Sequence, residues 1–545
     1  MSNAYDTEIF ERSVEGSADF EIPIKSVQRY EVTDSNLGNY SSGQVKFNLN
    51  QLATSSSYID WKKSHLVIPI TLAVASTKAD GLVGNTLYSH YYATLKSSFT
   101  SLLDSIVLSI NNTEVVSKTG SLMNIPMYFN LLTSFDRNDV DALGASIGFI
   151  PDSVESFRFV HNTTANPPTG RGELNNQLGG APISFAPSFA ANTGRNWRHY
   201  KTVTSLLDDV TKEFFTAGRM NTSHKSYCDA NAASGLMSNH IECCIPLRYI
   251  HSVFGALPLM RGSSVQLLVN THLPSTASFT TTAAGTDFDL GNNVARSSSS
   301  PNGFLPFIVC DPATALNSAA AQTITVKCNV GNIFNSQCQL RLSLCELNPE
   351  FESRLIKSPM KQVNYRDWYC FPNQTVGVAS GSSINQMLSV NIPKMRRLLI
   401  VPKVAVNGAV AEWVDAYQSP WTSAGCTTTP ALITNLQVML SGKPVYQSPL
   451  AYSWEQFLLE VEGCNSISGS VEDGLRAGLI DRQGFESIYG FTVVNLSRKD
   501  SADDVIEKTI QISFTNNSTK AMTYSYFIEY ERGWEIDVVS GKIVV

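Results

Sequence analysis

The feature that most constrains this fold is an internal repeat of strand-like sequence at a spacing of 330 residues. Ser105–Asn111 and Asn435–Ser441 both alternate apolar with other side chains and then enter a tight turn. A valine follows each turn, Val115 in the first copy and Val445 in the second. Self-similarity at a fixed spacing predicts two copies of one structural unit.

More elements recur in the same order. The 330-residue spacing places a G-x-x-x-G motif twice, with Gly144, Gly148 and Ile150 matching Gly474, Gly478 and Ile480. Asn124-Ile125-Pro126 opens a helical stretch near the place where the same spacing puts a helix after Ser453, and proline suits the first turn of a helix. Several elements in one order and nearly one register indicate a duplicated fold.

Two strand pairs extend this match upstream and downstream. Lys62–Ile68 parallels Lys394–Ile400 at a spacing of 332 residues. Leu342–Leu347 is typical of a closing strand, as is Tyr526–Tyr530. We therefore expect each copy to contain corresponding strands near its beginning and at its end.

Period-two alternation defines the fold class. Ile510, Ile512 and Phe514 share one face of a predicted strand, and a second alternating set runs from Met522 to Tyr530 after an Asn/Ser turn. Such patterns are typical of antiparallel strands with one buried face. Strand-helix-strand alternation is absent, which argues against a parallel α/β fold. The sequence predicts an all-β chain of two tandem β-sandwiches with a few short helices.

The best helix signal covers Trp454–Glu462. Ser453 can cap its start, Gln456 completes an S-x-x-Q capping box, and Gly463 ends it. The apolar positions fall on one face, which we interpret as core rather than as a binding groove; they are Trp454, Phe457, Leu458 and Val461.

A chain of 545 residues is too long for one hydrophobic core. Composition shifts mark the expected divisions. They are an N-terminal arm at 1–25, a first sandwich at 26–348 with exposed loop insertions at about 162–194 and 275–303, a hinge at 349–360, and a second sandwich at 361–545.

Charge sets limits on the partners. The formal net charge is −7, and Met1–Glu21 holds one arginine against six acidic residues. Because phosphate neutralisation supplies most nucleic-acid affinity, direct genome packaging by this terminus and sequence-specific nucleic-acid binding are not expected. Charged residues make up 16% of the chain, below the usual value of about 25%. That scarcity suits a surface buried against neighbours, and a loop-rich β protein would share it.

Cysteine usage and hydropathy indicate a soluble protein without a metal. None of the ten cysteines forms a CxxC pair or a zinc-type Cys/His set, and no secretory signal is evident, so we expect reduced and mostly buried thiols. The most apolar strand, Leu66–Ile70, is far shorter than a membrane span of about 20 residues. No cofactor is predicted.

Enzymatic interpretations are weak. Gly144–Gly148 fits the G-x-S-x-G hydrolase motif, but no clear strand precedes it and Pro151 follows it, so the two glycines are better explained as structural. The eight histidines show no H-E-x-x-H pattern. Paired acids at Asp208-Asp209, Asp503-Asp504 and Glu346–Glu352 are typical of solvated turns. We predict no enzyme activity and no catalytic, cofactor-binding or metal-binding residues.

Several segments together resemble a known family. They are Ser42–Phe47, Tyr58–Ile70, Ile245–Asn270, Leu344–Glu350, Lys361–Asp367 and Phe527–Arg532. In this order they resemble the double jelly-roll major capsid proteins of polinton-like viruses, virophages and larger double-stranded DNA viruses. The resemblance implies two eight-stranded antiparallel jelly rolls, and a homotrimer that forms a pseudo-hexagonal capsomer of an icosahedral shell.

The resemblance also implies partners and a location. Neighbouring capsomers, minor capsid proteins and penton proteins would be partners, an internal membrane is a further candidate, and the protein would be made in an infected host cell and reside in the virion. A different class stays open: a β-sandwich surface-binding or adhesin-like protein. That alternative requires a secretion route and disulfides, for which the sequence gives no sign. A minor capsid or vertex protein is a third reading, but it commonly carries a single jelly roll.

Overall fold

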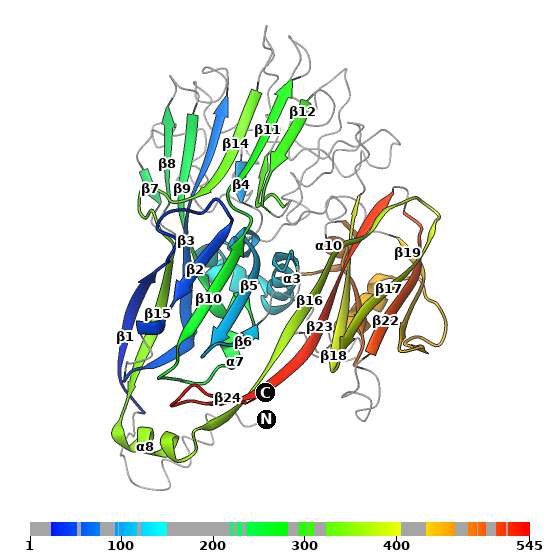
Figure 1. The fold of residues 1–545 in the computed structure, drawn as a ribbon. Helices are drawn as coiled ribbons and strands as arrows, with labels where there is room; N and C mark the ends of the chain where they lie inside the picture. Colours follow the sequence, from blue (N-terminus) through cyan, green and yellow to red (C-terminus); the bar gives the residue numbers. More distant parts are fainter. Residues whose placement is uncertain are drawn as a thin grey trace.

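The computed structural model shows a chain dominated by antiparallel strands (Figure 1). The residues that it describes are 23–51, 56–76, 93–95, 98–116, 121–149, 219–221, 226–231, 236–281, 294–301, 304–309, 323–404, 432–462, 464, 478–487, 489–497, 508–518 and 521–544. Among these residues, no helix is both long and apolar enough to span a bilayer.

Four strands from each of two sheets build the first sandwich. One set belongs to a nine-stranded sheet and has the order β1 (Ile24–Thr33), β15 (Gln339–Leu347), β3 (Tyr58–Ser76), β9 (Leu236–Pro246). The other has the order β2 (Gln44–Asn48), β10 (Val265–Thr271), β5 (Leu103–Ile110), β6 (Thr113–Val116). Counting these eight strands along the chain, the sheets run 1-8-3-6 and 2-7-4-5, which is the jelly-roll order.

The second sandwich repeats that order. Its first sheet runs β16 (Met360–Val378), β23 (Met522–Asp537), β18 (Met395–Val404), β21 (Thr492–Asn495). Its second sheet runs β17 (Ser383–Ile392), β22 (Lys508–Asn516), β19 (Ile433–Leu440), β20 (Lys443–Pro444). The predicted all-β fold of two tandem jelly rolls is therefore confirmed.

The repeat found in the sequence joins equivalent strands. Ser105–Asn111 covers most of β5 and Asn435–Ser441 most of β19, and both are the fourth strand of their jelly roll. The turn after each is left-handed at both central residues, with φ of 48° and 64° at Asn111 and Asn112 and of 47° and 81° at Ser441 and Gly442. Paired positive φ values are typical of two-residue hairpin turns, which fix strand register.

Extra strands lengthen the first jelly roll at one end. β3 and β9 continue beyond the sandwich. There β3 pairs with β14 (Thr323–Val330), which is followed by β11 (Ser275–Thr281) and β12 (Val294–Ser299). On the other side, β9 pairs with β8 (Ser226–Asn231), which is followed by β7 (Arg219–Asn221). Figure 1 shows these strands as a tower above the first sandwich. A short ladder joins β4 (Ala93–Leu95) to β13 (Phe307–Val309).

The expectation of a loop at 275–303 was wrong at both ends of that segment, which form the β11 and β12 hairpin. Threonine favours strands, and the side chains of Thr280 and Thr323 hydrogen-bond across the ladder at 2.9 Å. The middle of this segment, the 162–194 insertion and almost all of the 1–25 arm lie outside the described residues.

Short helices fill the ends of the sandwiches. They are η2 (Phe99–Leu102), α3 (Asn124–Ser134), α4 (Arg137–Leu143), η3 (Gly144–Ile147), α6 (Leu247–Ile250), α7 (Val253–Ala256), α8 (Pro349–Lys357), α9 (Trp454–Val461) and α10 (Arg482–Ser487). α8 occupies the connection for which a hinge was predicted. A last short strand, β24 (Ile543–Val544), pairs with β23.

Helix α9 has the predicted N-cap but a different side-chain partner at Gln456. The Ser453 hydroxyl accepts the Gln456 amide at 3.3 Å, and Phe457 and Val461 are buried. The expected capping box was wrong, because the Gln456 side chain donates to Glu460 Oε1 at 2.6 Å. Buried Glu460 also accepts the Asn495 amide at 2.7 Å, which ties the helix to the end of β21.

Candidate functional site: the junction between the jelly rolls

Strand β23 belongs to two hydrophobic cores at once. Tyr524, Tyr526 and Ile528 point into the second sandwich, whereas Phe527 and Ile536 belong to the cluster that continues through the first. The first sheet of the second jelly roll is thus covered on both faces, once by its own partner sheet and once by the first jelly roll. Because apolar burial is the main stabilising term in folding, this arrangement fixes the two units together.

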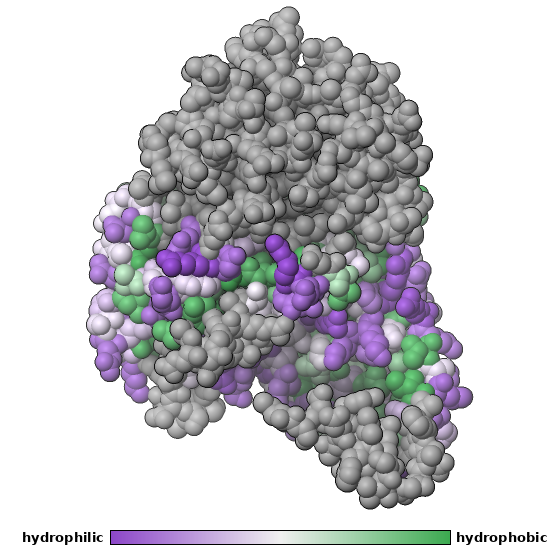
Figure 2. Space-filling view, turned by 180° about the vertical axis from the view of Figure 1, so that it is seen from behind, coloured by the Kyte–Doolittle hydropathy of each residue, from purple (hydrophilic) through white to green (hydrophobic). Residues whose placement is uncertain are grey.

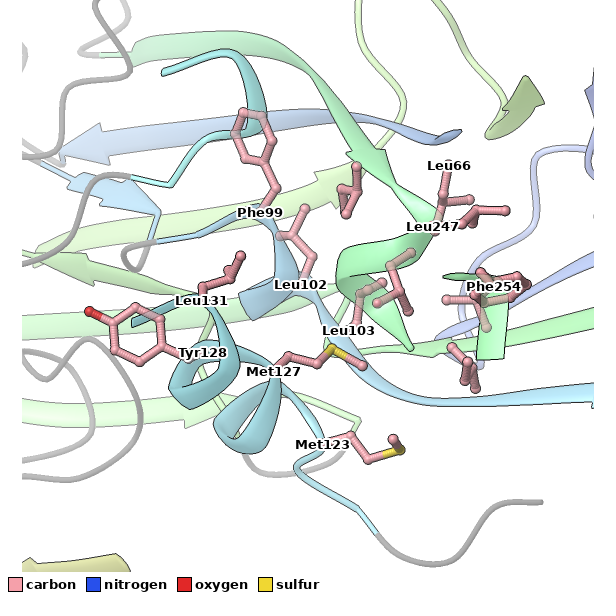
Figure 3. Close-up of a cluster of buried hydrophobic side chains, with 14 of the residues drawn as sticks. Leu66, Phe99, Leu102, Leu103, Met123, Met127, Tyr128, Leu131, Leu247 and Phe254 are labelled. Atoms are coloured by element: carbon pink, nitrogen blue, oxygen red, sulfur yellow. The ribbon is translucent and has the colours of Figure 1, made fainter. Parts of the chain in front are cut away.

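Helix α3 supplies much of this contact. The Phe129 ring packs edge-on against Phe491 with centroids 5.0 Å apart, and the Leu479 amide donates to the Leu132 carbonyl oxygen at 2.8 Å. Figure 3 shows Met127 and Tyr128 leaving α3 in opposite directions, Met127 towards Leu103 of the first sandwich. The helix is apolar around most of its circumference, as expected for one that is buried on several sides.

A buried carboxylate connects the two jelly rolls at a second point. Asp367 on β16 is fully buried, and its Oδ1 lies 3.1 Å from Nε2 of His251, which follows α6 in the first jelly roll. The Trp368 amide donates to the same oxygen at 2.8 Å. Tyr530 and Arg532 donate to Oδ2 at 3.2 and 3.3 Å.

The electrostatics of this cluster favour the ionised carboxylate. Burial opposes ionisation of Asp367, but the hydrogen bonds from His251 and the Trp368 amide and the charge of Arg532 outweigh it, so the pKa of Asp367 is lowered. The Val253 amide donates to Nδ1 of His251 at 3.2 Å, which leaves the proton of a neutral imidazole on Nε2, facing Asp367. Every polar contact here therefore has a defined donor and acceptor.

Backbone contacts continue the junction on either side of Asp367. The Ser252 hydroxyl donates to the Arg366 carbonyl oxygen and accepts the Arg366 amide. The Tyr365 hydroxyl donates to the Val115 carbonyl oxygen at 2.7 Å, which links β16 to edge strand β6. The Tyr365 hydrogen bond is buried and the Ser252 hydrogen bonds are exposed, and together they fix the position of β16 against the first jelly roll.

A buried ion pair lies on the junction-facing side of the second jelly roll. Arg397 Nη1 is 2.7 Å from Glu529 Oε2, and both side chains are less than a tenth exposed. Arg366 approaches the other Glu529 oxygen at 3.7 Å. Buried pairs contribute little net stability, but removal of one partner leaves an uncompensated charge, so this pair makes the sheet face specific for its partner.

An open cleft of about 300 Å³ lies at the end of the junction away from the tower. It is lined by β6, the turn before β18, β23 and β24, including Glu114, Lys394, Arg532 and Trp534. Arg532 is already engaged with Asp367, and its guanidinium lies 6.0 Å from the Tyr365 ring centroid. Arg532, one of the charged residues of this cleft, thus belongs to the junction itself.

The motif G-x-S-x-G does not form a nucleophile elbow. Ser146 is exposed on η3, which directly follows α4 rather than a strand. Gly148 has a φ of +65° and lies against the Phe99 ring, where a Cβ would sit 2.3 Å from a ring carbon. Its counterpart Gly478, with φ of +66°, lies against the backbone of Leu132 and Thr133. Both glycines allow close packing, as the sequence predicted.

The acidic pairs also have structural surroundings. Glu346 lies 3.7 Å from Lys25, Glu350 lies 2.8 Å from Arg354, and Glu352 pairs with Arg261. Asp208-Asp209 and Asp503-Asp504 lie outside the described residues. Within the described part of the chain, no group of three or more His, Cys, Asp or Glu side chains could hold a metal ion. Seven of the cysteines located there are free thiols, and all of these seven except Cys244 are buried.

Sequence reasoning missed the junction. His251 and Asp367 are 116 positions apart, and neither stands in a motif. One signal was available: α3 is apolar on nearly every side, whereas α9 has a single apolar stripe. A helix that is apolar on nearly every side, such as α3, needs a second packing partner besides its own sandwich.

The strand order of the two sandwiches defines the chain as a double jelly roll. It is similar to a chain of the Sputnik virophage structure determined by cryo-EM, at 12% identity and a TM-score of 0.48, over 96% of this chain and 88% of that one. It is also similar to the mavirus major capsid protein, at 10% identity and a TM-score of 0.46, over 97% and 91% of the two chains. The Faustovirus major capsid protein matches at 9% identity and a TM-score of 0.43, over 95% and 92%. No family model and no curated protein sequence matches.

Proposed function

We propose that the chain is the major capsid protein of a double-stranded DNA virus, three copies of which form a pseudo-hexagonal capsomer of an icosahedral shell. The observation that carries the proposal is the junction. Two jelly rolls of one topology stand side by side and share a sheet that is buried on both faces. Such a chain is a rigid block of two similar units, which suits a closed ring of alternating units.

The polarity of the molecule supports the same function. The tower strands lie at one end, whereas α8 and β24 lie at the other (Figure 1). A shell component needs distinct outer and inner ends, and in this proposal the tower faces outwards. Figure 2 shows hydrophobic residues in separate patches among hydrophilic ones on the described surface seen from behind. Dispersed patches suit contacts with several neighbours more than one large groove.

The chemistry of the proposal is packing rather than catalysis. The strongest polar cluster, around Asp367, is buried and fully engaged in joining the two jelly rolls. We propose no catalytic, cofactor-binding or metal-binding residues. Neighbouring capsomers, minor capsid proteins and penton proteins would be the partners, with the virion shell as the location and an internal membrane as a further candidate partner.

Light scattering after size exclusion tests the proposal. The chain has a mass of 59.6 kDa, and we expect a stable species of three chains at micromolar concentration. Negative-stain electron microscopy of concentrated protein should then show sheets or shells of hexagonal units. A well-behaved monomer at all concentrations would contradict the capsomer, and would favour the adhesin-like alternative, for which glycan binding is the next measurement.

A further inference from the structure

Helices α3 and α9, which follow the fifth strand of their jelly rolls, differ in one respect. Asn124 and Trp454 begin α3 and α9 and are 330 residues apart, so the same spacing matches Phe129 with Leu459. Phe129 is 1% exposed because the second jelly roll covers it, whereas Leu459 is 48% exposed. The same position thus carries a large apolar side chain in both copies, but only one of them is covered.

The exposed stripe of α9 extends along the whole helix. Glu455, Leu459 and Glu462 fall at i, i+4 and i+7 and are all exposed. Their counterparts in α3 are Ile125, Phe129 and Leu132, all buried. We call Glu455, Leu459 and Glu462 the α9 stripe. The strands next to these helices differ in the same way. The Val115 carbonyl oxygen of β6 accepts a hydrogen bond from the second jelly roll, whereas the counterpart strand β20 is exposed.

The surface that covers α3 also has a counterpart. α3 and β6 pack against the sheet β16-β23-β18-β21, and the equivalent sheet of the first jelly roll is β1-β15-β3-β9. On its outer side, Val27 of β1 is 55% exposed. Arg29, Arg248 and Arg341 lie around His65 on this side, and after burial their charges are the largest causes that lower the pKa of His65. We call Val27, Arg29 and Arg248 the β1 patch.

Charge complementarity joins these two surfaces. The α9 stripe presents two carboxylates beside one leucine, and the β1 patch presents two arginines beside one valine. Within the described residues, neither Arg29 nor Arg248 has a carboxylate within ion-pair distance, whereas Arg341 is paired with Glu31 and Glu242. A contact between the surfaces would cover both apolar side chains and give Arg29 and Arg248 acidic partners.

We infer that the α9 stripe of one copy binds the β1 patch of the next copy, so that the contact between copies repeats the junction within each chain. This inference rests on the proposed function, and it names the surfaces through which the ring of three chains closes. The contact is heterologous, because two different surfaces meet. In a closed ring of alternating first and second jelly rolls, the α9 stripe and the β1 patch of every copy are both bound.

The test compares Leu459→Asp, Glu462→Arg and a control, Met387→Asp, by sedimentation equilibrium and light scattering. Met387 is 59% exposed on β17, the edge of its sheet opposite β20. Leu459→Asp removes the apolar contact with Val27 and requires a further carboxylate to be desolvated, so we expect the trimer to dissociate at concentrations at least about tenfold higher than for the wild type. The control should assemble like the wild type.

Glu462→Arg provides a second variant whose fold is not at risk. A cation at the C-terminal end of α9 interacts favourably with the helix dipole, so the monomer should stay folded while arginines meet across the contact. Dissociation of this variant supports the inference, even if Leu459→Asp fails to fold. Suppose that the wild type is a trimer, and that Glu462→Arg and folded Leu459→Asp assemble as well as the wild type. The inferred contact is then overturned, while the proposed capsomer is unaffected. A monomeric wild type would instead refute the proposed function.

Discussion

His251 and Asp367 lie in different jelly rolls, and their side chains meet at 3.1 Å between His251 Nε2 and Asp367 Oδ1, with both residues almost completely buried. Asp367 also accepts a hydrogen bond from the guanidinium of Arg532 on β23. One carboxylate therefore connects the end of α6, the start of the second jelly roll and its closing strand. The junction depends on it more than on any exposed ion pair, because exposed pairs contribute about 0–1 kcal/mol.

Replacing this carboxylate should loosen the junction. Asp367→Ala leaves the Arg532 charge and the His251 N–H without their acceptor, and we expect a loss of about 3 kcal/mol in the free energy of unfolding. Urea unfolding followed by tryptophan fluorescence measures it. The control Glu350→Ala removes an exposed acid paired with Arg354 on α8, and its effect should stay within about 0.5 kcal/mol. Equal effects of the two substitutions would contradict the assigned role.

The same carboxylate predicts a pH dependence. Its pKa is lowered in the folded chain, so its contribution is fully present above the unfolded value of about 3.9 and is lost as the pH falls through the folded value. Glu531, whose pKa is lowered chiefly by its hydrogen bond to Arg396, acts in the same direction. The stability difference between wild type and Asp367→Asn should therefore shrink below about pH 4. A difference that is constant from pH 7 to pH 2 would show that Asp367 is not ionised in the junction.

The aromatic contact across the junction should be costly to remove. Phe129→Ala leaves a cavity against Phe491, and we expect a loss of about 3–5 kcal/mol in the free energy of unfolding. The matched control is Leu459→Ala at the equivalent position of α9, where the side chain is half exposed in the monomer. In unfolding of the monomeric chain, that control should cost less than about 1 kcal/mol. Comparable losses would mean that the two helices are equally covered within one chain.

Gly478 tests the backbone contact between α3 and the second jelly roll. It has a positive φ, and an added Cβ would lie 2.4 Å from the Leu132 carbonyl oxygen. Gly442 also has a positive φ but nothing within 4 Å. Gly442→Ala should therefore cost only the conformational strain of about 1 kcal/mol, and Gly478→Ala clearly more. Thermal unfolding of both variants measures the difference, and equal shifts would exclude the close contact.

The sequence predicted the sandwiches better than their junction, for a physical reason. Strands such as β22 record burial in local alternation, with Ile510, Ile512 and Phe514 all buried. This signal is missing where the paired side chains are polar, so the sequence predicts a loop where the Ser- and Thr-rich strands β11 and β12 form. Local alternation also does not predict which side chains from distant parts of the chain will contact one another. Gln456 bonds to Glu460 rather than to its own N-cap, because Glu460 is buried against the end of β21.

Imaging the purified particle tests the central claim most directly. Cryo-electron microscopy of the size-exclusion peak should give class averages with threefold symmetry and six lobes, two from each chain, with the tower strands on one side. Particles with two lobes, or dimers with twofold symmetry at every concentration, would contradict the capsomer and the proposed function with it.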